Sequence, residues 1–224
     1  MREEDLKILY EDNHLIAVFK PAGVLTQQDG FGELSLMDEV KEYLKEKYKK
    51  PGDVFLGLLH RLDRPVSGII LFAKTSKAAS RISEQFRDRK IKKIYHAVVK
   101  GFLSQRSGSL LHYVRKDRAK NKIEVSEQKK AGFQSAELCF KVLKRGEKYS
   151  LLEIELKTGR FHQIRGQLSA IGHPIVGDKK YGASFSLSDK AIALQASEII
   201  FKLVTKAGTK RIKVPLPDHW KKYI

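Results

Sequence analysis

Short runs in which apolar positions alternate or follow one another cover much of the chain, and they predict strands. The runs at 8–10 and 15–20 flank a turn, EDNH, and a Pro-Ala-Gly sequence at 21–23 ends the second run. This spacing of strand and turn residues predicts a β-hairpin. The continuous apolar run at 68–73 is typical of a strand that is buried on both faces.

More strand-like runs follow, and their turns predict three further hairpins. The first hairpin turns around the basic sequence KDRAKN, the second at Gly146, and the third closes the chain. The runs lie at 93–101, 110–116, 122–127, 133–145, 149–157 and 197–215.

Helical spacing interrupts the strands in three places. Ser35 followed by Asp38 is a capping-box signature, a second helix begins at Thr75 or Ser76, and a third is expected from Thr158 as N-cap to Gly172. The expected inward stripes are Leu36, Val40, Tyr43, Leu44 and Tyr48; Ala79, Ile82 and Phe86; and Phe161, Ile164, Leu168 and Ile171.

Hairpins interrupted by single helices predict an α+β protein with a largely antiparallel mixed sheet flanked by a few helices. No internal repeat, low-complexity tract or linker-like break divides the sequence. We therefore expect one domain over residues 1–224. A chain of this length buries enough surface to fold without disulfides or metal.

The composition favours a soluble cytoplasmic protein. Cys139 is the only cysteine, so an internal disulfide is excluded and a reducing compartment is expected. The first residues, MREEDLKILY, lack a signal pattern, and the longest apolar runs are far shorter than the ~20 residues of a membrane span. We expect no membrane association.

The net charge indicates a class of partner, because 44 Lys and Arg against 26 Asp and Glu give a net charge of +18. Residues 87–130 alone hold 14 basic and 4 acidic residues, which is a net charge of +10. Self-repulsion of this size destabilises a compact fold, and a polyanionic partner would relieve it. Nucleic acid is the partner that this pattern favours.

The sequence HRLDRP at 60–65 is the first candidate for chemistry. It lacks the H-R-D-x-x-x-x-N spacing of a kinase, and Ser67 is not in a G-x-S-x-G nucleophile elbow. The histidines have no metal-ligand spacing, so no metal site is expected. What remains is Asp63, a carboxylate flanked by arginines in a loop before a buried strand.

The second candidate is the block at 158–182, which is polar along one side of the expected helix. Arg165 shares this helix with inward-facing Ile164 and Leu168, and a half-buried arginine needs a carboxylate partner. Spacing alone does not pair Arg165 with Asp63.

Three long motifs, in this order, carry a resemblance: HRLDRPVSGIILFAK at 60–74, KKIYHAVVKG at 92–101, and TGRFHQIRGQLSAIGHPIVGDKKYG at 158–182. Together with EDNHLIAVFKPAGVLTQ at 11–27 and the closing IALQASEIIF and VPLP, they strongly resemble the RluA-type pseudouridine synthases of large-subunit rRNA and tRNA. The resemblance covers about residues 7–217. It implies the catalytic fold of that family with a central cleft, without the N-terminal S4-like module of many relatives.

The resemblance implies an isomerase that acts on uridine in rRNA or tRNA and needs no cofactor. The N1–C1′ bond of the uridine breaks, the base turns, and it reattaches through C5. The catalytic aspartate of the family falls on Asp63, the active-site tyrosine on Tyr95, and the arginine that pairs with the aspartate on Arg165. Whether Asp63 attacks carbon or abstracts a proton is left open by the sequence.

RNA contacts are expected from the motifs and from the basic hairpin. Arg61 resembles an arginine that enters the RNA where the flipped base was, Arg64 is expected on phosphate, and His60 and His162 are either pocket-wall or structural residues. The expected clamp on phosphates at the hairpin consists of Arg115, Lys116, Arg118, Lys120 and Lys122. We expect a monomer that binds a loop uridine.

Two other functions compete with this interpretation. A non-catalytic RNA-binding or ribosome-assembly factor could keep the same fold, and a hydrolase acting on RNA is a weaker third option. The presence of Asp63, Tyr95 and Arg165 together argues against the non-catalytic factor, because a binding protein has no use for that trio.

Overall fold

The computed structural model describes residues 6–30, 32–187 and 190–224 of the chain. These residues divide into two compact units. Unit 1 comprises the chain up to Ile91 together with Glu198–Val214, and unit 2 comprises Lys92–Ser197 and Pro215–Ile224. The division does not test the expectation of one domain, which stays a prediction.

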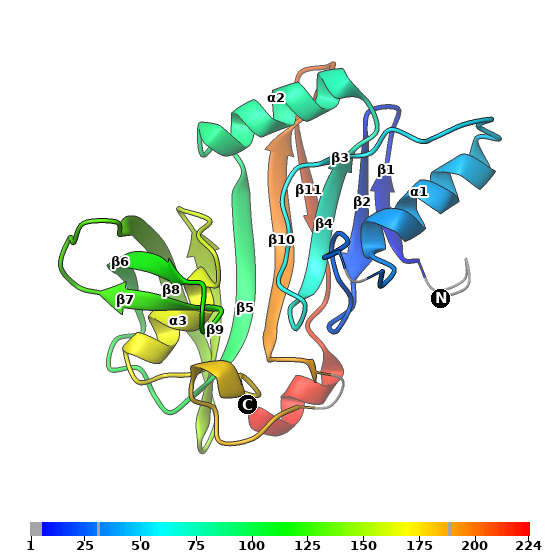
Figure 1. Ribbon diagram of the computed structural model, residues 1–224. Helices are drawn as coiled ribbons and strands as arrows, with labels where there is room; N and C mark the ends of the chain where they lie inside the picture. Colours follow the sequence, from blue (N-terminus) through cyan, green and yellow to red (C-terminus); the bar gives the residue numbers. More distant parts are fainter. Residues whose placement is uncertain (1–5, 31, 188–189) are drawn as a thin grey trace. The chain divides into compact units, whose positions relative to one another are not determined.

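Unit 1 is built on a sheet with strand order β1-β2-β4-β10, in which β11 pairs with β10 and β3 pairs with β4. The pairs β1–β2, β2–β4, β3–β4 and β10–β11 are antiparallel. Two helices, α1 and α2, complete the unit (Figure 1). The elements are β1 (Ile8–Glu11), β2 (Leu15–Lys20), α1 (Leu36–Lys47), β3 (Gly57–Leu58), β4 (Ser67–Ala73), α2 (Ser76–Arg87), β10 (Leu194–Lys202) and β11 (Thr209–Lys213). The first residues of β10, up to Ser197, belong to unit 2.

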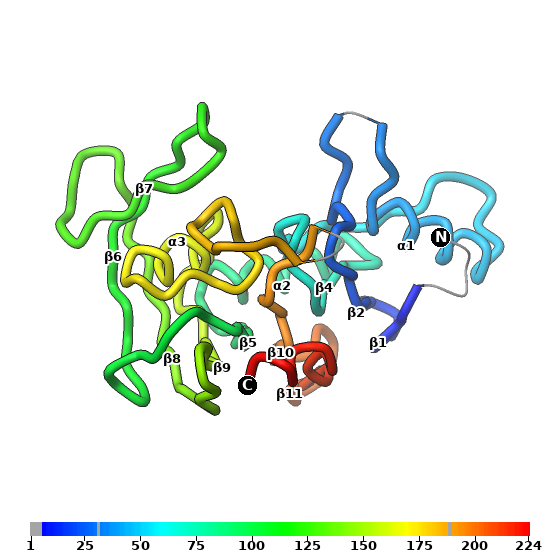
Figure 2. Tube along the Cα trace, turned by 90° about the horizontal axis from the view of Figure 1, so that it is seen from below, coloured from blue at the N-terminus to red at the C-terminus, as the bar shows by residue number. Residues whose placement is uncertain are grey.

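Unit 2 contains an antiparallel sheet with strand order β5-β9-β8-β6-β7. The helix α3 packs against β6 and β7, and both views show it beside that hairpin (Figures 1 and 2). The elements are β5 (Lys92–Lys100), β6 (Ser107–Asp117), β7 (Lys122–Ser126), β8 (Gln134–Arg145), β9 (Tyr149–Leu156), α3 (Gln163–Ala170) and two 3-10 helices, η2 (Lys179–Tyr181) and η4 (Asp218–Tyr223).

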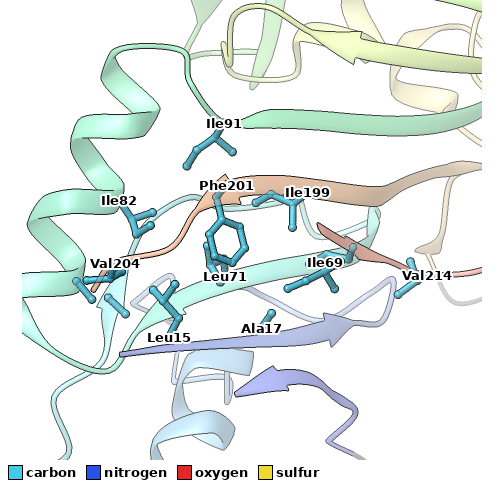
Figure 3. Close-up of a cluster of buried hydrophobic side chains, with 13 residues drawn as sticks. Leu15, Ala17, Ile69, Leu71, Ile82, Ile91, Ile199, Phe201, Val204 and Val214 are labelled. Atoms are coloured by element: carbon cyan, nitrogen blue, oxygen red, sulfur yellow. The ribbon is translucent and has the colours of Figure 1, made fainter. Parts of the chain in front are cut away.

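The core of unit 1 shows why β2 and β4 form where they do. Alternate residues of β2, β4 and β10 point toward α2 and join Ile82 and Ala78 in one apolar cluster (Figure 3). The residues between them in β4, Ile70 and Phe72, are also fully buried. The run at 68–73 therefore is a strand buried on both faces, as its unbroken apolar sequence predicts.

The α+β class with a largely antiparallel mixed sheet, the four hairpins and the helices α1 and α2 are confirmed. The capping box at Ser35 and Asp38 forms, and the Thr75 side chain caps α2 by accepting from Ala78 N–H at 3.2 Å. Within the expected inward stripe of α1, Leu36, Val40 and Leu44 are buried. The expectation that Tyr48 faces inward is wrong, because Tyr48 follows the last helical residue and is 46% exposed.

The predicted start of the third helix is also wrong. It begins at Gln163 with His162 as N-cap, and not at Thr158. The Thr158 hydroxyl accepts the Glu137 N–H of β8 at 2.8 Å and donates to the Gln163 side chain at 2.8 Å, so it ties a loop to the sheet. His162 has a left-handed backbone with φ of 48°, which no residue inside an α-helix adopts. Phe161 consequently precedes the helix.

No helix in the described part of the chain is long and apolar enough to span a bilayer.

Candidate active site

Asp63 lies in unit 1, in the loop that connects β3 to β4. Its carbonyl accepts the Val66 N–H at 3.0 Å, which closes a turn over Arg64 and Pro65. The Asp63 side chain is half-buried, whereas Leu62 and Val66 on either side are buried. The loop therefore anchors its apolar residues in the core while the carboxylate stays at the surface of the unit.

A second segment, residues 20–26 after β2, braces this loop on both sides of Asp63. The Thr26 hydroxyl donates to the Leu62 carbonyl at 3.0 Å and accepts the Leu62 N–H at 3.2 Å. On the other side, the Gly23 N–H donates to the Arg64 carbonyl at 2.8 Å, and Arg64 Nε donates to the Gly23 carbonyl at 2.8 Å. Both neighbours of Asp63 are thus fixed by paired hydrogen bonds, which limits the motion of the carboxylate.

Lys20, the last residue of β2, is fully buried beneath the loop. Its Nζ donates to the carbonyls of Pro21, Val24 and Arg64 at 2.9, 2.8 and 3.1 Å. Burial lowers the pKa of Lys20 to about 7, while the charge of Asp63 raises it and the charge of Arg64 lowers it. Lys20 is not among the residues predicted from the sequence, since a lysine at the end of a strand is usually exposed.

The remaining predicted residues of the HRLDR sequence have different surroundings. His60 Nε2 accepts the backbone N–H of Leu71 at 3.0 Å, and the ring lies 5.3 Å from that of Phe86, so His60 ties the loop to β4. Arg61 is exposed. The Arg64 guanidinium pairs with Glu33 at 2.6 Å, and the side chain of Arg64 is 35% exposed.

Tyr95 and Arg165 lie in unit 2. Tyr95 is in β5, opposite Ile154 of β9, and is 7% exposed. Arg165 is in α3 and is 4% exposed. It makes a bidentate ion pair with Asp178, with Nε–Oδ2 at 2.7 Å and the second guanidinium nitrogen to Oδ1 at 2.9 Å.

The expectation that Arg165 needs a carboxylate is met within unit 2 by Asp178, which is 1% exposed. Asp178 is not among the residues predicted from the sequence, because it follows the helix in a loop whose path the spacing does not define. A guanidinium has five N–H groups, and the pair with Asp178 uses two of them. This ion pair is therefore compatible with a second acceptor, and the pairing of Arg165 with Asp63 stays a prediction.

Tyr181 connects α3, the loop before it and the basic hairpin. Its hydroxyl accepts the Ile123 N–H of β7 at 2.9 Å and is joined to His162 Nδ1 by a 2.9 Å hydrogen bond. The Arg165 guanidinium lies 5.0 Å above its ring. At Gly166 a side chain would overlap Ile123, so only glycine lets α3 approach β7 this closely. The hairpin is therefore docked on the helix that carries Arg165.

The five predicted phosphate-binding residues fall into two groups. Three lie over aromatic rings: Arg115 over Phe133 at 4.9 Å, Lys116 over Phe161 at 4.3 Å and Lys122 over Tyr181 at 5.9 Å. Arg118 and Lys120 are exposed at the turn between β6 and β7, where Lys120 Nζ is 3.9 Å from Asp117. Arg115 also pairs with Glu124 at 2.8 Å. The hairpin thus presents cations on rings along its strands and more open cations at its tip.

The model of the RNA pseudouridylate synthase family matches residues 14–170. The chain belongs to that family. The match includes Asp63, Tyr95 and Arg165, and the resemblance to RluA-type enzymes is confirmed.

Two curated relatives bear names of the same activity. The chain is 34% identical over 198 residues to an uncharacterized RNA pseudouridine synthase, YhcT, of Bacillus subtilis, which covers 87% of this chain and 63% of that relative. It is 31% identical over 242 residues to tRNA pseudouridine synthase C of Vibrio parahaemolyticus, which covers 98% of this chain and 94% of the relative. The chain thus spans less than two thirds of the first relative and nearly all of the second.

A solved structure supports the fold. The human RNA pseudouridylate synthase domain containing 4 superimposes with a TM-score of 0.80 at 23% identity, over 96% of this chain and 90% of that one. The predicted pseudouridine synthase fold, a largely antiparallel sheet with few helices, is confirmed.

Proposed function

We propose that this chain is an RNA pseudouridine synthase that converts uridine in rRNA or tRNA to pseudouridine. The observation that supports it most is the braced loop of Asp63, because a carboxylate whose two neighbouring residues are fixed by hydrogen bonds is suited to act on one defined atom. The family and the names of the relatives supply the reaction. A non-catalytic RNA-binding factor would have no need of a carboxylate held in this way.

In the proposed reaction, Asp63 acts at the sugar, either as a nucleophile on carbon or as a base. The N1–C1′ bond breaks, the uracil turns, and a C1′–C5 bond forms. The proton on C5 then leaves and N1 gains one, so the product has the composition of the substrate. Tyr95, which is nearly buried in β5, stacks on the base and handles the proton at C5.

Arg165 is proposed to keep Asp63 ionised by its fixed positive charge. The pair that Arg165 makes with Asp178 supports this role, since it fixes the guanidinium in orientation. Removal of this cation by Arg165→Met should therefore move the acid limb of the pH–rate profile to higher pH.

RNA binding is proposed for the basic hairpin and for Arg61 and Arg64 of the loop. Uridines in single-stranded loops fit best, because an unpaired base is extruded at the lowest free-energy cost. His60 and His162 have hydrogen bonds to Leu71 N–H and to the Tyr181 hydroxyl, which support structural roles for both histidines. We further propose a cytoplasmic protein that acts as a monomer.

The test is pseudouridine formation in total cellular RNA incubated with the wild-type protein, Asp63→Asn or the control Glu33→Gln. The control removes one carboxylate that pairs with Arg64, beside the same loop. We expect product with the wild type and with the control. Product with Asp63→Asn above about 1% of the wild-type amount would contradict the catalytic role of Asp63, and no product with the wild type would contradict the proposed activity.

A further inference from the structure

Lys20 is a buried cation to which the proposed reaction assigns no part. Its side chain has no exposed surface, and its Nζ donates to the carbonyls of Pro21, Val24 and Arg64. A neutral amine has two N–H groups, whereas an ammonium has three. Three acceptors at hydrogen-bond distance therefore match the charged form of the lysine.

Burial of an ammonium is unfavourable unless an opposite charge compensates it. The three carbonyls are neutral dipoles and supply only part of this compensation. The charges of unit 1 that act on Lys20 are those of Asp63, which favours the ammonium, and Arg64, which opposes it. The negative charge that stabilises Lys20 is therefore the carboxylate proposed to act at the sugar.

The interaction between two charges is mutual, so Lys20 must favour ionised Asp63 to the same extent that Asp63 favours the ammonium. The lysine also holds the backbone next to Asp63, because one of its three hydrogen bonds ends on the Arg64 carbonyl at 3.1 Å. The same carbonyl accepts the Gly23 N–H, so the turn that follows Asp63 is anchored twice.

We propose that Lys20 is a positioning residue that fixes the loop through the Arg64 carbonyl and keeps the Asp63 carboxylate ionised by its own charge. Lys20 touches no substrate and acts only through Asp63. The inference deepens the proposed function and rests on it for the meaning of Asp63. A lysine that only fills space under the loop would lack the electrostatic link.

The first test needs no activity. With 13C placed at the lysine ε-carbons, the titration of Lys20 is followed by NMR in the wild type, in Asp63→Asn and in Glu33→Gln, and its signal is assigned by its loss in Lys20→Met or, if that variant does not fold, in Lys20→Arg. We expect Asp63→Asn to lower the titration midpoint of Lys20 by roughly 1 pH unit or more. Glu33→Gln removes an equal negative charge, that of the carboxylate paired with Arg64, and should leave the midpoint of Lys20 within about 0.3 unit of the wild type. An equally unchanged midpoint in Asp63→Asn would overturn the proposal.

The second test uses kinetics and compares Lys20→Met with Thr26→Val. Both remove hydrogen bonds that brace the loop, but only Lys20→Met removes a charge. We expect both variants to lower kcat with little change in KM, and only Lys20→Met to move the acid limb of the kcat profile upward, by about 1 pH unit. A lower kcat with an unmoved limb would show a merely structural lysine and overturn the proposal.

The two tests keep failure of the inference distinct from failure of the proposed function. If the wild type makes no pseudouridine, the function fails, while the NMR titration still decides whether Lys20 and Asp63 are coupled. If Lys20→Met does not fold, the titration of the wild type and Asp63→Asn decides alone.

Discussion

The loop of Asp63 and the basic hairpin of β6 and β7 are both rich in charge, but they are held in different ways. Asp63 is flanked by residues whose backbone groups are fixed by buried donors, Thr26 and Lys20. The hairpin has exposed cations whose contacts are aromatic rings and surface carboxylates. The first arrangement specifies the position of one carboxylate, while the second provides a positive field that can adapt to a partner.

The two regions should also differ in how much their charged groups contribute to the free energy of unfolding. Surface ion pairs such as Arg115–Glu124 contribute about 0–1 kcal/mol, so the charges of the hairpin add little to stability. Buried pairs are different, because removal of one partner leaves a desolvated charge. We infer that the buried polar groups of this chain set the geometry for chemistry, and that the exposed ones set the affinity for RNA.

The largest effect on stability is expected at the buried ion pair of unit 2. Asp178→Asn or Arg165→Met alone should lower the free energy of unfolding by about 3–5 kcal/mol, because each leaves the other charge buried without its partner. The double variant should regain most of this loss. Urea unfolding of the two single variants and the double variant measures the coupling. Additive losses would show that the two residues do not stabilise each other.

Substitutions in the basic hairpin should affect RNA binding and not the free energy of unfolding. Replacement of Arg115, Lys116, Arg118, Lys120 and Lys122 by Ala should weaken binding of all RNAs alike. Each lost phosphate contact should lower the log–log salt slope by roughly 0.7–0.9. Filter binding at several salt concentrations gives the slope.

A matched control removes the same number of charges from unit 1. It replaces five exposed lysines, Lys45, Lys49, Lys50, Lys77 and Lys206, by Ala. Its salt slope should stay close to that of the wild type. An unaltered slope in the hairpin variant, or an equal drop in the control, would place the RNA on another face.

The smallest effect is expected for Thr26→Val. The variant keeps the shape of the side chain but leaves the N–H and carbonyl of Leu62 without the hydroxyl. The loss of free energy of unfolding should be about 1–3 kcal/mol, below that of the buried ion pair. A thermal or urea unfolding curve measures this loss. A loss of unfolding free energy as large as that of Asp178→Asn would contradict this ranking of the two sites.

The sequence predicts the parts of the fold in which a local pattern decides the structure. The capping box at Ser35 fixes the start of α1, and the unbroken apolar run at 68–73 becomes a strand buried on both faces. The helix start at Thr158 was wrong because a contact from β8, distant in sequence, takes that hydroxyl away from a cap. Propensity gives no sign of such a tertiary contact.

The candidate site was only partly predictable for the same reason. Asp63 and Arg165 stand out because charged residues interrupt apolar surroundings, and the family motifs give them roles. Lys20 and Asp178 did not stand out, since their importance depends on burial and on partners brought close by loops. A lysine that ends an otherwise apolar strand sequence, LIAVFK, is the one local signal that could have indicated Lys20.

The most direct measurement is single-turnover pseudouridine formation on one RNA with two variants, Asp63→Asn and the five-alanine hairpin variant. We expect Asp63→Asn to keep the Kd within about twofold of the wild type while forming no detectable product. The hairpin variant should raise the Kd while its rate at saturating RNA stays within about twofold of the wild type. A loss of affinity in Asp63→Asn, or a loss of rate at saturation in the hairpin variant, would contradict the division between chemistry and binding.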